Sequence, residues 1–274
     1  MTHVEPYIRV GLFLGLFIAI ALGKRIFPRR HTREPKRARW FNNLSIMVIG
    51  TLCIRFLFPV LPVGFALLCS EKGWGILNIY TLPFAAKVII GVIALDFIIY
   101  LQHVMFHAVP TLWRMHVMHH SDRDFDVTTA LRFHPLEIIL SMFIKLLTVM
   151  VLGPPPVAVL IFEVLLNGTA MFNHSNIHIP PLIDRLLRLL IVTPDMHRVH
   201  HSVIIRETNS NYGFNLPWWD YLMETYRAQP ARGHDGMTIG IGWLREKNLL
   251  TLPGLLIMPF RRLSGKHPMN MGGK

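Results

Sequence analysis

Histidines recur in this sequence at spacings that suit a metal ion. Two triplets share one pattern, in which the second and third histidines follow the first by three and four positions, and a pair four positions apart precedes each triplet. Residues three or four positions apart lie on one face of a helix, so the imidazoles of each triplet should converge. Neutral imidazole is a ligand for iron, zinc, copper or nickel. The ten histidines of the pattern are His103, His107, His116, His119, His120, His174, His178, His197, His200 and His201.

Ten imidazoles are too many for one ion, because a metal site takes about three to six such ligands. Two ions with about five histidines each is the simplest count, and it leaves a position on each ion for water or oxygen. Spacing alone does not identify the metal. The pattern therefore predicts a site for two metal ions.

Each ligating imidazole should also donate its second N–H to a carboxylate, a carbonyl or water. Asp96 precedes His103 by seven positions, two helical turns on the same face, and it lies deep in an apolar run where an acid is costly. We expect the orienting groups among six residues near the histidines: Asp96, Tyr100, Asp122, His134, Asn173 and Asp195.

The composition places these histidines in a membrane protein. Of the 274 residues, 52% are hydrophobic and only 16% are charged, and the mean hydropathy is +0.40, which is too apolar for an ordinary soluble domain. The net charge of +12 could suggest nucleic acid. A nucleic-acid reader, however, has no need of several long uncharged apolar runs. We therefore expect a membrane as a partner, and no nucleic acid.

The apolar runs predict an all-α integral membrane protein with about four transmembrane helices, arranged as two hairpins that carry a cytosolic helical cap. A first span is expected within residues 7–27. Residues 44–69 should form a span that Pro59 and Pro62 kink or break, and residues 83–102 should return the chain to its starting side.

A second hairpin is predicted over residues 136–172, where two apolar runs are joined by a Gly-Pro-Pro-Pro sequence. Each run is slightly short for a full crossing, so a tilted or re-entrant hairpin stays possible. Lys145 and Glu163 lie at similar distances from the turn and therefore at similar depth. We predict that they form an ion pair.

The basic residues set the topology. Residues 24–39 contain eight Lys or Arg and one Glu, which by the positive-inside rule makes this short loop cytoplasmic. Each later out-and-back excursion then delivers a histidine pair to the same side. All ten histidines are expected on the cytoplasmic face of a bacterial inner membrane or an ER-type membrane.

The whole chain, 1–274, is predicted to be a single membrane domain. Helices that lie in the membrane interface are expected at 180–192 and 242–263. The chain divides into N-terminal spans at 7–102, a first histidine segment of the cap at 103–135, the hairpin at 136–172, a second histidine segment of the cap at 173–247, and an interfacial helix with a basic tail at 248–274.

Four histidine motifs, HVMFH, HVMHH, HSNIH and HRVHH, occur with RFHPLE, TPDMHRVHHS and NSNYG. In this combination the chain resembles the fatty acid hydroxylase/sterol desaturase superfamily of membrane di-iron enzymes, especially its bacterial-type members. The resemblance covers about residues 96–226. It implies that the ten motif histidines bind two iron ions in a cytosolic cap on a four-helix transmembrane stem. Members commonly have Phe-Gly-Thr where this chain has Met223-Glu224-Thr225, a departure remote from the histidines.

The resemblance also implies a reaction, the O2-dependent attack on an unactivated C–H bond of a lipid. Hydroxylation would give an alcohol, and loss of a second hydrogen would give an alkene instead. Electrons would come from a separate donor. Whether the substrate is an acyl chain, a sterol, an ether lipid or a carotenoid stays open.

Three other classes of protein are alternatives. A zinc-dependent membrane hydrolase would use fewer histidines and a catalytic carboxylate. A metal transporter would place its ligands near the bilayer midplane, whereas these histidines lie at the ends of spans. A membrane haem protein would need axial histidines that face each other inside the bundle.

Overall fold

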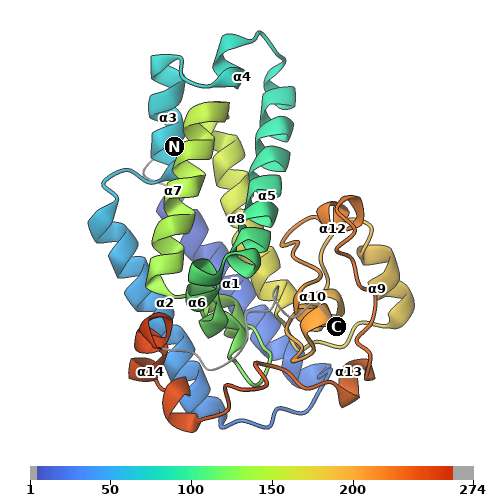
Figure 1. The fold of residues 1–274 in the computed structure, drawn as a ribbon. Coiled ribbons are helices and arrows are strands. Elements are labelled where there is room, and N and C mark those ends of the chain that lie inside the picture. The colour runs from blue at the N-terminus through green and yellow to red at the C-terminus, as the bar shows by residue number, and fades with distance from the viewer. Residues whose placement is uncertain (1–4, 262–274) are drawn as a thin grey trace.

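A computed structural model describes residues 5–261 of the chain, and all of the regular elements in this range are helices (Figure 1). The predicted all-α fold is confirmed. The long helices are α1 (Glu5–Ile26), α2 (Lys36–Leu57), α3 (Pro62–Lys72), α5 (Phe84–Ala108), α6 (Pro110–His120), α7 (Pro135–Leu152) and α8 (Pro156–Asn173). The short helices are α4 (Ile76–Ile79), η1 (Thr129–Leu131), α9 (Pro181–Leu187), α10 (Pro194–His200), α11 (Ile205–Thr208), α12 (Trp218–Leu222), α13 (Gly233–Gly236), η2 (Lys247–Leu250), α14 (Leu252–Ile257) and η3 (Met258–Phe260).

Five segments of the described chain are long and apolar enough to cross a membrane, where the sequence suggested about four. They stand side by side as a stem in Figure 1. Many of their apolar side chains are exposed on the outside of the stem, as lipid contact requires. The segments are Tyr7–Ile26, Lys36–Ile79, Phe84–Ala108, Pro135–Leu152 and Pro156–Asn173.

Prolines end the stem helices where the sequence predicted. Helix α2 ends at Leu57, and α3 begins with Pro62 in its first turn, so the break expected at Pro59 and Pro62 is confirmed. The turn between α7 and α8 is built by Gly153, whose φ of 66° is the left-handed conformation that glycine adopts most easily. The backbone there packs so closely against Gly75 that a Cβ on Gly75 would lie 2.3 Å from the Gly153 nitrogen.

The predicted ion pair inside the hairpin is confirmed. Lys145 Nζ of α7 lies 2.8 Å from Glu163 Oε1 of α8. Arg9 of α1 contacts the other oxygen of the same carboxylate. Because a buried carboxylate is costly without partners, the two cations stabilise Glu163 and join three stem helices.

A cap of short helices and ordered loops packs against one end of the stem (Figure 1). Helices α1 and α2 extend into it and are tied to its loops by charge. Arg39 of α2 lies 2.7 Å from Asp122 and 2.7 Å from Asp126, and Lys24 of α1 lies 2.9 Å from Asp126. These buried contacts fix the cap to the stem at the end where the basic loop between α1 and α2 lies.

The two helices expected in the membrane interface are shorter than predicted. Residues 242–261, the described part of the predicted helix 242–263, do not form one helix, because Leu255 and Met258 turn inward and pack against α6, and the chain breaks into η2, α14 and η3. In the other stretch, α9 ends at Leu187, and Arg188 is buried and paired with Asp184. The basic tail expected after Arg261 lies outside the described residues.

Candidate metal centre

Helices α5 and α6 bring four of the histidines together. Two lie one turn apart near the end of α5, and Pro110 then starts α6 after a short break at Val109. Proline in the first turn of α6 lacks the N–H that would continue the preceding helix, so the chain changes direction there. As a result α6 packs back against α5, with its own His116 and His120 facing the pair from α5.

Nine of the ten predicted histidines gather in two adjacent groups. Within each group one ring nitrogen per histidine lies within 4.8 Å of all the others. All nine side chains are at most 2% exposed. The five-histidine group consists of His103, His107, His116, His120 and His200. The four-histidine group consists of His119, His174, His197 and His201.

Each group contains one histidine from the other half of the chain. His200 of the second triplet joins the histidines of the first half, and His119 of the first triplet joins those of the second half. The ring centroids of His120 and His201 are only 4.6 Å apart, so the groups touch. Neither half of the sequence therefore completes a group on its own.

His178 lies apart from both groups, and this corrects the expectation that all ten histidines converge. Helix α8 ends at Asn173, so the spacing from His174 to His178 is not helical. The chain after His174 instead runs beside the end of α1, where the His178 N–H donates to Phe27 O at 2.8 Å. The His178 side chain is exposed.

Hydrogen bonds fix which nitrogen of four rings faces inward. An oxygen lies 2.7 Å from Nδ1 of each, which makes Nδ1 the protonated atom and leaves Nε2 with a lone pair. The acceptor oxygens are Tyr212 O for His103, Glu137 Oε1 for His116, Ala170 O for His174 and Ser210 O for His200. Backbone carbonyls and one carboxylate thus orient the rings as metal ligands require.

These inward lone pairs face one another. Nε2 of His103 lies 3.1 Å from Nε2 of His116. In both rings the N–H is on Nδ1 and donates outward, so neither Nε2 carries a proton. Two lone pairs at that distance repel unless a cation lies between them. Two ligands at right angles on an ion with a metal–nitrogen distance of about 2.1 Å would be about 3.0 Å apart. The donor atoms therefore fit a metal ion.

The protonation state of the cap histidines also suits metal binding. Burial, with a further contribution from neighbouring histidines, keeps the rings neutral by lowering their pKa. The pKa of His174 falls to about 4, and the pKa values of His119, His120, His197, His200 and His201 lie well below the usual value. Neutral imidazole is the form that coordinates a metal.

Glu137 is the orienting residue that sequence reasoning missed. It lies two positions into the apolar helix α7, where an acid is costly without a partner, and that cost is the signal that could have identified it. Asp220 acts one step further away, since it accepts the N–H groups of Tyr212 and Gly213 at 2.8 and 2.9 Å. It thereby fixes the carbonyl that holds His103.

The six predicted orienting residues lie around the histidines, but within the described chain none has a hydrogen bond to a ring of the two histidine groups. They hold the surrounding frame instead. Asp96 accepts from Trp219, Tyr100 bonds to Thr225, Asp122 pairs with Arg39, His134 lies against Leu256 O, Asn173 donates to Phe214 O, and Asp195 pairs with Arg29 and Arg198.

A cavity of about 640 Å³ leads from the stem helices to the five-histidine group. Residues of α1, α2, α5, α7 and α8 line it, most of them apolar. His103, His116 and Glu137 form part of its wall. Its volume is in the range of pockets that hold small molecules, and its apolar lining suits a hydrocarbon chain.

Comparisons with known proteins agree with this geometry. The family model for fatty acid hydroxylase matches residues 88–225, half of the chain, and this range contains all nine histidines of the two groups. An ornithine lipid hydroxylase of Rhizobium tropici is 26% identical over 95% of this chain and 79% of its own length. The human alkylglycerol monooxygenase is 33% identical over 53% of this chain and 32% of its own length.

A further relative is the cholesterol 25-hydroxylase of Rattus norvegicus, which is 26% identical over 53% of this chain and 48% of its own length. The chain thus spans under half of the length of the mammalian relatives. No solved structure shows a significant match. The family model, the histidine pattern and the all-helical fold agree, and the chain belongs to the fatty acid hydroxylase family of oxidoreductases.

Proposed function

We propose that this protein hydroxylates a C–H bond of a membrane lipid with O2, at two iron ions held by the nine histidines of the two groups. The cavity carries the proposal. It lies among helices apolar enough to stand in a bilayer, and its wall includes His103 and His116, two members of the five-histidine group. A hydrocarbon chain from the bilayer that fills this cavity has its C–H bonds next to metal ligands.

Iron held by these histidines would supply the activation of O2 that an unactivated C–H bond requires. The overall change is RH plus O2 plus two electrons and two protons, giving ROH and water. Nitrogen ligands suit iron, and two adjacent groups suit two ions. The metal identity and the count of two are part of the proposal.

The protein's own residues hold the ligands and the substrate in place. Glu137 accepts the Nδ1 proton of His116 and fixes that ring toward the site. Phe106 and Phe133 lie beside the same ring, with centroids 5.7 and 6.2 Å from it, and both line the cavity. These apolar walls exclude water and leave the end of the cavity to the hydrocarbon.

The length of the cavity suits a lipid chain. Lys145 and Glu163 line one part of it, and Glu137 lines the part beside the histidines. Eight residues of α7 separate Lys145 from Glu137, which corresponds to about 12 Å along the helix axis. The wall between them includes Ile138 and Met142. An extended apolar segment of this length fits between the two polar regions.

The names of the three relatives describe hydroxylation or monooxygenation of an ornithine lipid, an alkylglycerol and cholesterol. These names favour a lipid substrate and an alcohol product over an alkene. We propose that the site faces the cytoplasm, because Lys24 and Arg39, at the two ends of the basic loop, both contact the cap that carries the histidines. A separate electron donor completes the reaction.

Lipid analysis of expressing cells tests the proposal. The wild type is compared with a His119→Ala, His200→Ala double variant, which removes one ligand from each group, and with His178→Ala as a matched control outside both groups. We expect a lipid that gains one oxygen in the wild type and the control and is absent in the double variant. A lipid that loses two hydrogens would indicate desaturation, and identical lipids in all three would contradict the proposal.

A further inference from the structure

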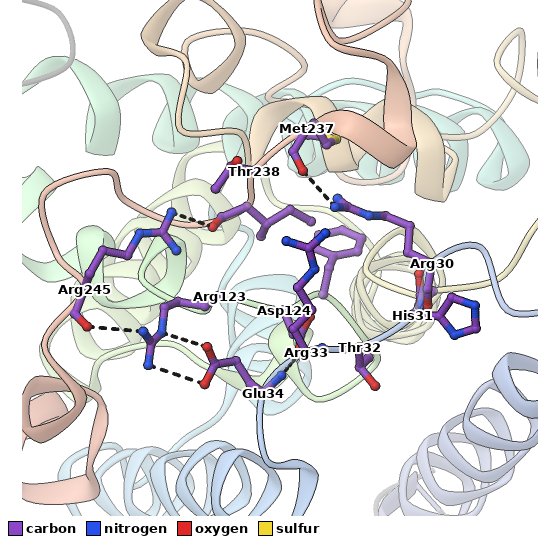
Figure 2. Close-up of a pocket in the computed structure, with 13 residues that line it drawn as sticks. Arg30, His31, Thr32, Arg33, Glu34, Arg123, Asp124, Met237, Thr238 and Arg245 are labelled. Atoms are coloured by element: carbon purple, nitrogen blue, oxygen red, sulfur yellow. Dashed lines mark hydrogen bonds and ion pairs between the residues drawn. The ribbon is translucent and has the colours of Figure 1, made fainter.

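A second pocket, of about 210 Å³, opens on the cap and is lined mainly by charged and polar side chains (Figure 2). Its walls come from the basic loop between α1 and α2, from residues 123–125 and from residues 237–245. In Figure 1 the loop between α1 and α2 lies at the end of the molecule opposite α4, and so away from the far end of the stem. The lipid cavity and this pocket share no residue.

The pocket carries an excess of positive charge. Arg30, Arg33, Arg123 and Arg245 line it together with only two carboxylates, Glu34 and Asp124, which leaves two positive charges. The carboxylates are already occupied. Arg123 Nε lies 3.2 Å from Glu34 Oε1, and Asp124 accepts the backbone N–H groups of Arg33 and Glu34 at 2.9 and 2.7 Å.

Two of the guanidinium groups have N–H donors that could bind a further acceptor. Arg33 is exposed, points into the pocket in Figure 2, and has no hydrogen-bond or ion-pair partner for its guanidinium within residues 5–261. Nη1 of Arg30 is buried without a partner. Burial and the proximity of Arg33 lower the pKa of Arg30. An approaching carboxylate would relieve this crowding of cations.

One side chain, Phe125, lies between the pocket and the four-histidine group. Phe125 lines the pocket, and its ring centroid lies 5.0 Å from that of His201 and 5.4 Å from that of His174. An electron delivered at the pocket would thus cross a single aromatic ring to reach the proposed metal ligands. A structural anion would gain nothing from this position, whereas an electron carrier would.

We propose that this pocket is the docking surface for an acidic one-electron carrier protein. The inference rests on the proposed function, in which each hydroxylation consumes two electrons and two protons and reduces O2 to one hydroxyl group and one water. The carrier docks twice per turnover and is oxidised by one electron each time. Carboxylates on its surface pair with Arg33 and Arg30, and its redox centre faces Phe125.

The test uses the purified full-length chain loaded with iron, in detergent, and an acidic plant-type [2Fe–2S] ferredoxin as probe. Binding of oxidised ferredoxin gives a readout independent of turnover. Turnover is then driven either by ferredoxin with its reductase or by dithionite with a small viologen mediator, which needs no docking surface. The variants are Arg33→Glu and Arg245→Glu, with Arg33→Lys to retain the charge and exposed Arg206→Glu as a charge-reversal control.

We expect Arg33→Glu and Arg245→Glu to weaken ferredoxin binding and to raise the ferredoxin KM about tenfold, because reversal of a charge opposes encounter. Arg33→Lys, Arg206→Glu and all dithionite-driven rates should stay within about twofold of wild type. Raising the ionic strength from about 0.01 to about 0.15 M, which shortens the Debye length from about 30 to about 8 Å, should weaken wild-type binding.

Several results would overturn the docking proposal. These are a wild type that does not bind ferredoxin at low salt, an Arg33→Glu protein that binds as tightly as Arg206→Glu, or an equal loss of ferredoxin-driven and dithionite-driven turnover. Failure of the proposed function has a different signature. In that case the wild type would form no hydroxylated lipid even with dithionite, while the binding measurements would still decide the docking surface.

Discussion

His119 Nε2 lies 3.1 Å from His201 Nε2, although the two residues belong to different triplets 82 positions apart. The neighbouring residue His120 belongs to the five-histidine group, and its Nε2 lies 3.1 Å from Nε2 of His107. Adjacent residues of one helix thus serve two histidine groups. Each proposed ion should therefore depend on both halves of the chain.

Metal content should separate the two groups. We expect iron-loaded wild type to hold two ions per chain. His119→Ala should lose mainly the ion of the four-histidine group and His120→Ala mainly that of the five-histidine group, so each variant should hold about one. Elemental analysis of purified protein measures this. His178→Ala is the control and should keep two, and a loss of metal from that variant as large as from the others would refute the grouping.

Glu137→Gln should weaken metal binding without removing a ligand. The amide cannot accept the Nδ1 proton of His116 as strongly as a carboxylate does, and loss of such a partner reduces metal affinity by about 10- to 100-fold. Competition with a chelator gives the dissociation constant. Glu246→Gln, at an exposed position, should match the wild type. Equal affinities for all three proteins would mean that Glu137 does not orient His116.

Asp220 should make stability depend on pH. Burial raises its pKa to about 6, above the usual value of about 4. The folded protein then binds this proton more tightly than the unfolded chain does, so the free energy of unfolding should fall as pH rises from about 4 to about 6, by up to about 3 kcal/mol. Asp220→Asn should remove this contribution.

The pH dependence of stability is compared between wild type and Asp220→Asn. Their thermal midpoints, measured without metal in detergent, should differ most in pH dependence between pH 4 and 6. The control is Asp235→Asn, because Asp235 is exposed. Parallel pH curves for wild type and Asp220→Asn would show that the carboxyl group does not titrate in this range.

The ion cluster in the stem predicts unequal costs for its members. Lys145→Met leaves Glu163 paired with Arg9, whereas Glu163→Met removes the carboxylate that both Lys145 and Arg9 contact. Removing one side of a buried pair costs about 3 to 5 kcal/mol. Glu163→Met should therefore approach that cost and Lys145→Met should fall clearly below it, as measured by unfolding in detergent. A larger loss for Lys145→Met would contradict the shared pairing.

The sequence predicted those parts of the fold that depend on local rules. Proline lacks a backbone N–H, so Pro59 and Pro62 interrupt the helix. The Gly-Pro-Pro-Pro turn defines the hairpin and thereby places Lys145 and Glu163 at the same depth. The histidine spacing correctly predicted the triplets, because residues 116–120 lie within α6 and residues 197–201 lie in α10 and the position directly after it.

The rest depends on contacts that spacing does not encode. His178 follows the end of α8, so its helical register with His174 is lost. Asp122 and Asp195 seemed suited to orient ligands, but nearby arginines offer a stronger partner for a carboxylate than a neutral imidazole does. The exchange of His119 and His200 between the groups arises from how α6 packs against α10 and the loops of the cap.

The source of the oxygen atom in the product decides whether this protein is an oxygenase. Purified, iron-loaded protein is given lipid, a reductant and O2 of a heavy isotope, and the lipid is analysed by mass spectrometry. We expect one heavy oxygen atom in each product molecule and no product without O2. A product that takes its oxygen from water, or that forms with zinc in the absence of O2, would contradict the account and identify a hydrolase.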